Sequence, residues 1–325
     1  MKGRNVKRVR KAILVGLQAM AILLGCQSAI AQAQTDLSAE QLLKRAIKHY
    51  QNQKLDAAIA DFTRAIEVNS GTTRLPAMSF GFAAGNNNGE GSDTVAVADP
   101  FNALAYYNRG IARFSKGEID QAIADFDKAI RINSVYTDAY VRRGRSLQSK
   151  GETDLAIADY DKAIRLDPRS AFAYNNRGIA RRVKSDIAGA ISDFDKAISI
   201  NPRLPEVYVN RGAARCVAGD ITGAIADLDK AISINPLNAM AFNNRGKAHQ
   251  LKSDLHAAVA DYSQAIRIAP DYSLAYANRG LALLIAGKAD QAESDFRQAR
   301  RLNPDLKPSL DQLIDEVKTS RAAKQ

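Results

Sequence analysis

One nine-residue segment recurs through most of this chain at a constant spacing. "AIADFDKAI" begins at residue 122, and near-copies begin at 156 ("AIADYDKAI"), 190 ("AISDFDKAI"), 224 ("AIADLDKAI") and 258 ("AVADYSQAI"). Each copy starts 34 residues after the one before it, and a period of this size is typical of repeat arrays. Although 325 residues could form about two ordinary domains, the shared period predicts a single array in which each repeat packs on its neighbours.

An Arg-Gly pair aligns six complete repeats, which we number from the residue seven before the glycine. Position 8 is Gly110, Gly144, Gly178, Gly212, Gly246 and Gly280. Position 4 is aromatic: Tyr106, Tyr140, Tyr174, Tyr208, Phe242 and Tyr276. Positions 20 and 27 are always alanine, from Ala122 and Ala129 to Ala292 and Ala299. Position 24 is Phe126, Tyr160, Phe194, Leu228, Tyr262 and Phe296, and position 32 is Pro168, Pro202, Pro236, Pro270 and Pro304, with Ser134 in the first repeat.

This pattern resembles the tetratricopeptide repeat family, whose aromatic, Gly, Ala, aromatic, Ala and Pro landmarks fall in the same register. The resemblance implies an all-α fold, a right-handed superhelical α-solenoid of stacked helix-turn-helix repeats. It also implies a concave groove that binds proteins. One departure is that position 7, commonly leucine in the family, is arginine in every repeat.

The small residues of the repeat indicate how its two helices meet. A glycine inside a helix costs about 1 kcal/mol relative to alanine, so six of them at matching places predict a close approach between helices. We expect the glycine of the first helix to face the two alanines of the second, with the aromatic residues on either side. Left-handed caps that end the first helix are predicted at Gly117, Gly151, Gly219 and Gly287, with Ser185 and Ser253 in the other two repeats.

The repeat pattern also predicts where the array begins and ends. Residues 34–69 form a divergent amino-terminal repeat, in which Arg45 and Ala46 replace Arg-Gly. Residues 70–100 are rich in Gly, Asn and Ser and predict a flexible insertion. The six full repeats span 101–306, and 307–325 should hold a capping helix and a tail. The apolar residues expected on the inner side of this helix are Leu306, Leu310, Leu313, Ile314 and Val317.

The first 33 residues have the basic, apolar and small-residue parts of a bacterial secretory signal. Ala29-Ile30-Ala31 and Ala31-Gln32-Ala33 both fit an ordinary cleavage site. "LLGC" (23–26) instead resembles a lipobox, in which the signal is residues 1–25 and Cys26 is lipidated. We expect export to the periplasm, with lipid anchoring to the envelope membrane as the alternative.

The basic excess of the chain lies mostly in this leader. Six of the 46 basic residues and none of the 35 acidic ones fall in the first 31 positions, so the formal net charge of +11 drops to +5 for the remainder. No Lys/Arg stripe or aromatic-basic platform follows, so the sequence argues against nucleic-acid binding.

Residues for catalysis or for metal binding are not apparent. His49, His249 and His256 are scattered, and no carboxylate or thiol accompanies them at ligand spacing. The insertion's "NNNGEGSD" lacks the alternate acidic ligands of a calcium loop. We therefore expect no enzyme activity, no cofactor and no metal.

An arginine at position 7 always occurs together with an aspartate at position 23. The pairs are Arg109 and Asp125, Arg143 and Asp159, Arg177 and Asp193, Arg211 and Asp227, Arg245 and Asp261, and Arg279 and Asp295, with Arg45 and Asp61 in the divergent repeat. A buried arginine needs an anionic partner. We interpret these residues as structural ion pairs within or between repeats, with ligand binding as the less favoured alternative.

Asparagine recurs at position 6, where the family resemblance implies a place in the groove. The residues are Asn108, Asn176, Asn210, Asn244 and Asn278, with Arg142 in the remaining repeat. Asparagine is a poor helix former, and its amide can both donate to and accept from a peptide backbone. Arg145, Arg182 and Lys247 make the predicted groove weakly basic. Two alternatives are passive copying of the asparagines by duplication and bonding between neighbouring repeats.

The family's carboxylate clamp for chaperone tails is not formed by the corresponding residues here, which are Tyr107, Ile111, Arg142, Phe172 and Asn176. The sequence thus predicts an exported scaffold or adaptor that binds an extended or helical segment of another protein in its groove. A membrane-anchored structural lipoprotein of an envelope assembly is the alternative function.

Overall fold

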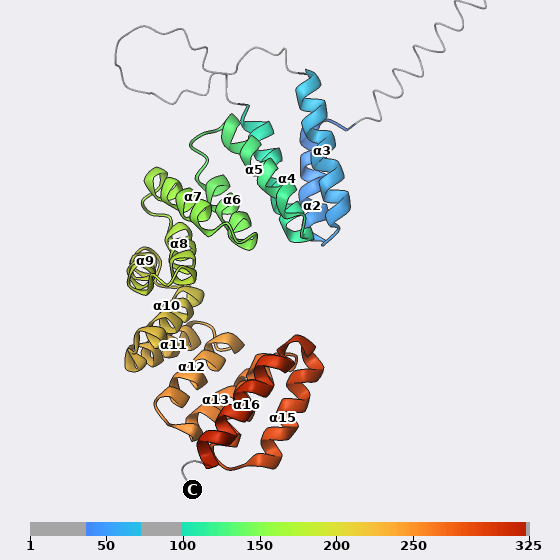
Figure 1. Cartoon of the computed structure of the whole chain (residues 1–325). Coiled ribbons are helices and arrows are strands. Elements are labelled where there is room, and N and C mark those ends of the chain that lie inside the picture. The colour runs from blue at the N-terminus through green and yellow to red at the C-terminus, as the bar shows by residue number, and fades with distance from the viewer. Residues whose placement is uncertain (1–36, 73–98, 323–325) are drawn as a thin grey trace, which may run out of the picture. The chain divides into compact units, whose positions relative to one another are not determined.

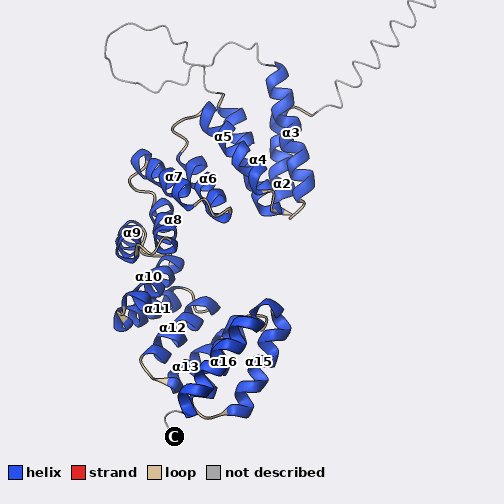
Figure 2. Cartoon of the chain, viewed as in Figure 1, coloured by secondary structure: helices blue, strands red, loops and turns tan. Residues whose placement is uncertain are grey.

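The computed structural model describes residues 37–72 and 99–322, and every regular element in these ranges is helical (Figure 2). The leader with Cys26, and most of the insertion predicted at 70–100, lie outside the described residues. Because the helices form stacked antiparallel pairs, the predicted all-α repeat fold is confirmed. The described chain divides into two compact units, one ending at Tyr136 and the other beginning at Thr137.

The first unit contains two helix pairs. Helices α2 (Ala39–Gln51) and α3 (Leu55–Thr72) form the divergent repeat, and α4 (Pro100–Lys116) and α5 (Ile119–Ile132) form the first full one. Helix α3 packs against α4, with Phe62 buried among alanines of both pairs. Residues 70–72 continue α3, so this helix extends three residues into the segment expected to be a loop.

The second unit contains five further helix pairs and a terminal helix (Figure 1). The pairs are α6 (Thr137–Ser149) with α7 (Thr153–Leu166), α8 (Ala171–Val183) with α9 (Ile187–Ile200), α10 (Pro205–Ala218) with α11 (Ile221–Ile234), α12 (Ala239–Leu251) with α13 (Leu255–Ile268), and α14 (Ser273–Ile285) with α15 (Ala289–Leu302). The second helix of each pair packs on the first helix of the next, and the first helices of successive pairs also touch. A 3-10 turn, Pro304–Leu306, leads into α16 (Lys307–Ala322), which packs on α14.

The repeat glycine makes room for an aromatic ring. A Cβ atom placed on Gly110 would lie 2.7 Å from Cε1 of Phe126, and one on Gly178 would lie 2.7 Å from Cε1 of Phe194. The same holds for Gly144, Gly246 and Gly280, which face Tyr160, Tyr262 and Phe296 at 2.5–2.8 Å. The prediction that the glycines face the two alanines was therefore only partly right: the nearest atoms belong to position 24, while the carbonyl oxygen of Ala258 would lie 3.1 Å from a Cβ atom added at Gly246. The physical reason is reach, because the ring at position 24 extends across the helix interface further than an alanine methyl can.

The alanines at positions 20 and 27 are nevertheless fully buried, as are the rings. At Gly212 the facing residue is Leu228, and the carbonyl oxygen of Ala224 would lie 3.2 Å from an added Cβ atom. Where the helices meet, very small residues therefore face large apolar side chains. This arrangement allows close packing with few voids.

The predicted left-handed caps are confirmed. Gly117, Gly151, Gly219 and Gly287 have φ between 84° and 88°. Ser185 and Ser253 adopt φ of 64° and 65° at the same position of their repeats, which costs more because a Cβ atom is present.

Helix α16 covers the end of the array with a narrow apolar stripe. Leu310 and Ile314 are buried against α14 and α15 residues, and Val317 packs beside them. Leu313 is 44% exposed, so its predicted inward position was wrong. Residues 310, 314 and 317 face inward at i, i+4 and i+7 spacing, and the helix rotation that buries them turns residue 313 to the side. Leu306 lies half-buried in the preceding 3-10 turn.

Candidate protein-binding face

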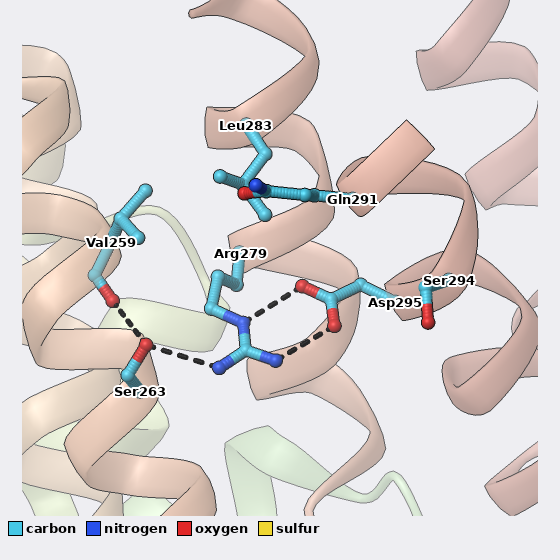
Figure 3. Close-up of a pocket in the computed structure, with 7 residues that line it drawn as sticks. All are labelled: Val259, Ser263, Arg279, Leu283, Gln291, Ser294 and Asp295. Atoms are coloured by element: carbon cyan, nitrogen blue, oxygen red, sulfur yellow. Dashed lines mark hydrogen bonds and ion pairs between the residues drawn. The ribbon is translucent and has the colours of Figure 1, made fainter. Parts of the chain in front are cut away.

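Arginine at position 7 and aspartate at position 23 form a bidentate ion pair in every repeat. Figure 3 shows one example, in which Nε and Nη2 of Arg279 each donate to Asp295 at 2.8 Å. The same geometry joins Arg45 to Asp61, Arg109 to Asp125, Arg143 to Asp159, Arg177 to Asp193, Arg211 to Asp227 and Arg245 to Asp261. All seven aspartates are buried. The arginine also lies over the aromatic ring at position 4, for example Arg177 over Tyr174 at 5.5 Å.

The same arginine also reaches the preceding repeat. Nη1 of Arg177 donates to Asp161 at 2.6 Å, and Nη1 of Arg279 donates to Ser263 at 3.0 Å. Arg211 and Arg245 make the corresponding bonds to Asp195 and Asp229. Hydrogen bonding, first of all to Asp193, raises the pKa of Arg177 above its ordinary value. Position 7 thus joins the two helices of one repeat to each other and to the second helix of the repeat before.

A second cation at position 11 was not anticipated from the sequence. Arg181 Nη1 donates to Asp193 at 2.9 Å, and Arg113 and Arg215 contact Asp125 and Asp227 in the same way. Position 11 is arginine in only three full repeats, at 113, 181 and 215. The other three have Leu147, His249 and Leu283, so the position does not stand out as a periodic feature of the sequence. Because these guanidinium groups contact buried carboxylates, the arginine-aspartate pairs form a framework that holds the repeats together.

The exposed side of the first helices carries the other predicted site residues. We define the A-helix face as positions 2, 6, 9 and 13 of α6, α8, α10, α12 and α14, all in the second unit. These positions are spaced at i, i+4, i+7 and i+11, so they share one side of each helix. The asparagines at position 6 of this face are half-buried, and Arg142, at the same position of α6, is exposed. Asn108 belongs to the first unit, where its amide donates to the carbonyl of Leu104 at 2.9 Å.

Two of the four asparagines on the A-helix face bond to the neighbouring repeat. Asn210 donates to Asn175 at 2.9 Å, and Asn278 donates to Asn243 at 2.9 Å. Asn175 and Asn243 occupy position 5 and are buried, so each needs a polar partner. Asn210 and Asn278 provide that partner. For these two residues the structure therefore shows the alternative role, which is bonding between neighbouring repeats.

The other two asparagines have side-chain N–H donors that bond to no described residue. Asn176 has no side-chain hydrogen bond to any described residue, and Asn244 only accepts a 3.5 Å bond from Asn243. The preceding repeat has Val141 or Val209 at position 5, where no amide can pair with them. The expected uniform row is thus an alternation of paired and unpaired amides. The motifs "YNNRG" (174–178) and "FNNRG" (242–246) were the signal for it, since only these two repeats carry two adjacent asparagines.

Unpaired cations lie on or beside the same face. Arg142, Arg182 and Lys247 have no ion pair with any described residue, and Nε of Arg182 is buried without a partner. Arg145 is exposed beside them on α6. The acidic residues of the face are Asp138 and Glu206, which leaves a net positive surface.

Exposed apolar side chains flank the polar middle of the A-helix face. They occupy positions 2 and 13, and each is at least 38% exposed: Phe172, Val183, Val217, Met240, Leu251, Leu274 and Ile285. Apolar residues gathered on one surface mark interaction sites more often than scattered ones do. In the described ranges no three His, Cys, Asp or Glu side chains are placed to hold a metal ion. Nor does any described helix have the length and apolar character needed to span a membrane.

The sequence of this chain matches models of one known protein family. Models described as "Tetratricopeptide repeat" match residues 103–134, 211–273 and 252–307, and one described as "TPR repeat" matches 144–182. The chain belongs to the tetratricopeptide repeat (TPR) family. TPR domains bind proteins or peptides and typically have no catalytic activity, so this TPR chain is an interaction scaffold.

Solved structures share the TPR fold at low sequence identity. A TPR protein from Parabacteroides merdae ATCC 43184 is 17% identical with a TM-score of 0.64, and the match covers 86% of this chain and 98% of that one. PilW, a type IV pilus biogenesis factor, is 19% identical with a TM-score of 0.58 over 62% of this chain and 94% of its own. A chain of the APC/C hetero-tetramer Cut9-Hcn1 is 18% identical with a TM-score of 0.61 over 67% and 43%. No curated protein matches this TPR chain.

Proposed function

We propose that the A-helix face binds an extended or helical segment of a partner protein. The observation that carries the proposal is the alternation of asparagines, because only Asn176 and Asn244 keep amides that are not needed by the fold. The free N–H donors of such an amide, and the remaining lone pair of its oxygen, can bond to a peptide backbone. Asn210 and Asn278 then serve the framework.

Charge and apolar area support the same proposal. The framework arginines are all neutralised, whereas Arg142, Arg182 and Lys247 are not. Such cations favour partners with net negative charge and raise the rate of encounter. Exposed Phe172, Met240 and Leu274 would supply the contact area that amides and cations lack.

The test compares the peptide affinity of a variant of the A-helix face with that of a control variant on α11, the second helix of its pair. Peptides selected from a random library on the full chain would be labelled, and their Kd measured by fluorescence anisotropy. N176A/N244A should weaken binding about tenfold or more, because each lost hydrogen bond contributes about 0.5–1.5 kcal/mol and 1.4 kcal/mol is tenfold in Kd. K230A, at an exposed position of α11, should leave Kd unchanged. Equal Kd values for all three proteins would refute the site.

We also propose that the chain is exported, on the evidence of residues 1–33. A second candidate function is a lipid-anchored structural protein of an envelope assembly. The "LLGC" segment ending at Cys26 favours it. The mass of the mature amino terminus distinguishes the two candidates. A chain starting at Gln32 or Gln34 supports a secreted adaptor, and a diacylated Cys26 supports the anchor. An intact Met1 would refute export.

A further inference from the structure

A pocket of about 210 Å³ opens on the A-helix face between α10 and α12. It lies wholly within the second unit, and one of its residues is Asn244, the unpaired amide described above. The lining residues are Ala213, Cys216, Val217, Asn244, Lys247 and Leu251.

One position that lines the pocket, position 12, holds a smaller residue in the fourth full repeat than in the others. Position 12 is Gln148 in the second repeat and Gln250 in the fifth, and each glutamine accepts a hydrogen bond from the tyrosine at position 24 of its own repeat, at 3.2 and 3.0 Å. In the fourth repeat these positions hold Cys216 and Leu228. The third and sixth repeats have Arg182 and Leu284 at position 12. Cysteine is the smallest side chain in this series, and a larger residue at position 216 would reduce the open volume.

The lining combines an apolar floor with two polar groups whose N–H donors have no partner among the described residues. Cys216 is half-buried and packs against the cluster around Leu228, and burial raises the pKa of its thiol, so the floor is uncharged at neutral pH. Val217 and Leu251 are 64% and 54% exposed. The Lys247 ammonium has no ion pair and the Asn244 amide donates to no described residue.

Size and charge indicate what the pocket accepts. An apolar cavity of about 150 Å³ binds benzene, so 210 Å³ is enough for one aliphatic or aromatic side chain. A buried apolar side chain gains about 1.5–3 kcal/mol from leaving water. An uncompensated ammonium at the same site favours a carboxylate beside that side chain.

We infer that this pocket is an anchor site for a partner peptide in which an aliphatic or aromatic residue stands next to an acidic one. The apolar side chain enters over Cys216, the neighbouring carboxylate pairs with Lys247, and a backbone carbonyl of the peptide accepts a hydrogen bond from Asn244. This inference rests on the proposed function of the A-helix face and specifies which partner sequence it selects.

The test fills the pocket with residues that the chain itself uses at these positions. C216Q/L228Y recreates the glutamine and tyrosine found in the second and fifth repeats, so it should fold, which far-UV circular dichroism would verify. K230A, at an exposed position of α11 outside the pocket, is the control. The probes are labelled peptides selected from a random library on the full wild-type chain.

The selected peptides should share an apolar residue adjacent to Asp or Glu. They should bind C216Q/L228Y at least tenfold more weakly than wild type and bind K230A within about twofold of it. K247E should weaken binding and shift selection toward peptides with Lys or Arg beside the apolar residue. Selection of peptides without the apolar-acidic pair, or unchanged Kd for the filled variant, would overturn the inference.

A measurement on the wild-type chain covers the case in which the filled variant does not fold. Bound peptide should slow alkylation of Cys216 by iodoacetamide at least fivefold, read by mass spectrometry of the fragment that carries this residue, and unchanged alkylation would contradict the inference. If N176A/N244A lowers affinity while the filled variant does not, the face binds but the pocket is not its anchor. If neither lowers it, both proposals fail. Binding of laurate with displacement of the peptides would assign the pocket to a fatty acid and overturn the peptide inference.

Discussion

The contact between the repeat glycine and the facing ring makes a quantitative prediction for Gly178→Ala. The added methyl carbon would lie 2.7 Å from Cε1 of Phe194 and 3.0 Å from two further ring atoms, and the ring is fully buried. Overpacking of this kind typically costs 1–3 kcal/mol, and we expect the upper part of that range because three ring atoms are too close. Replacing a helical glycine by alanine recovers about 1 kcal/mol. The expected net loss in the free energy of unfolding is therefore about 1–2 kcal/mol.

Equilibrium urea unfolding, followed by far-UV circular dichroism, measures this loss. Gly71→Ala is the control, because no atom lies within 4 Å of the position where its Cβ would stand, and this variant should be neutral or stabilised by up to about 1 kcal/mol. A double-mutant cycle with Phe194→Leu tests the cause, since the shorter side chain should reduce the cost of the alanine by about 1 kcal/mol. A Gly178→Ala protein as stable as wild type, or a cycle with no coupling, would refute the proposed contact.

Three further predictions concern the caps, the ion pairs and the paired amides. Ser185→Gly and Ser253→Gly relieve left-handed φ values of 64° and 65° and should each raise the thermal midpoint by about 2–4 °C, for a gain of about 1 kcal/mol; a lowered midpoint would contradict this. Asp193→Asn leaves Arg177 and Arg181 without their shared carboxylate and should cost about 3 kcal/mol in urea unfolding, whereas Asp161→Asn, at a 36% exposed side chain, should cost under about 1 kcal/mol; similar losses for both would count against the framework role. Asn210→Ala leaves the buried Asn175 amide unpaired and should cost about 1–3 kcal/mol, and adding Asn175→Val, the residue type present at 141 and 209, should restore part of that stability in the same assay.

The periodic residues were sufficient to predict the helix pairs, their caps and the order of repeats. Gly117, Gly151, Gly219 and Gly287 end helices because only the left-handed conformation closes that turn, and that requirement is local and readable from spacing. The partner of the repeat glycine was not readable in this way. Periodicity shows that positions 8, 20, 24 and 27 recur together, but it does not show which pair touches, and the ring of Phe194 reaches Gly178 because of its length and orientation.

The asparagines at position 6 show a second limit of predicting contacts from one repeat at a time. Asn176 and Asn210 occupy the same position and have similar burial, yet only Asn210 has a partner, because Asn175 lies in the preceding repeat and Val141 lies before Asn176. The pattern repeats over two units, so it is lost when all repeats are aligned to one consensus. The pocket lined by Cys216 was not predicted either. It depends on the small side chain at position 12 of the fourth repeat, a difference that disappears when all repeats are aligned to one consensus.

Site-specific photocrosslinking of a selected peptide is the most direct test of the claim that the A-helix face is the binding surface. A photoreactive residue would be placed at Val217, an exposed residue of that face, and in a second protein at Lys230, an exposed residue of α11. The account predicts a crosslink from position 217, competed by unlabelled peptide, and none from position 230. A crosslink from 230 without one from 217 would contradict it.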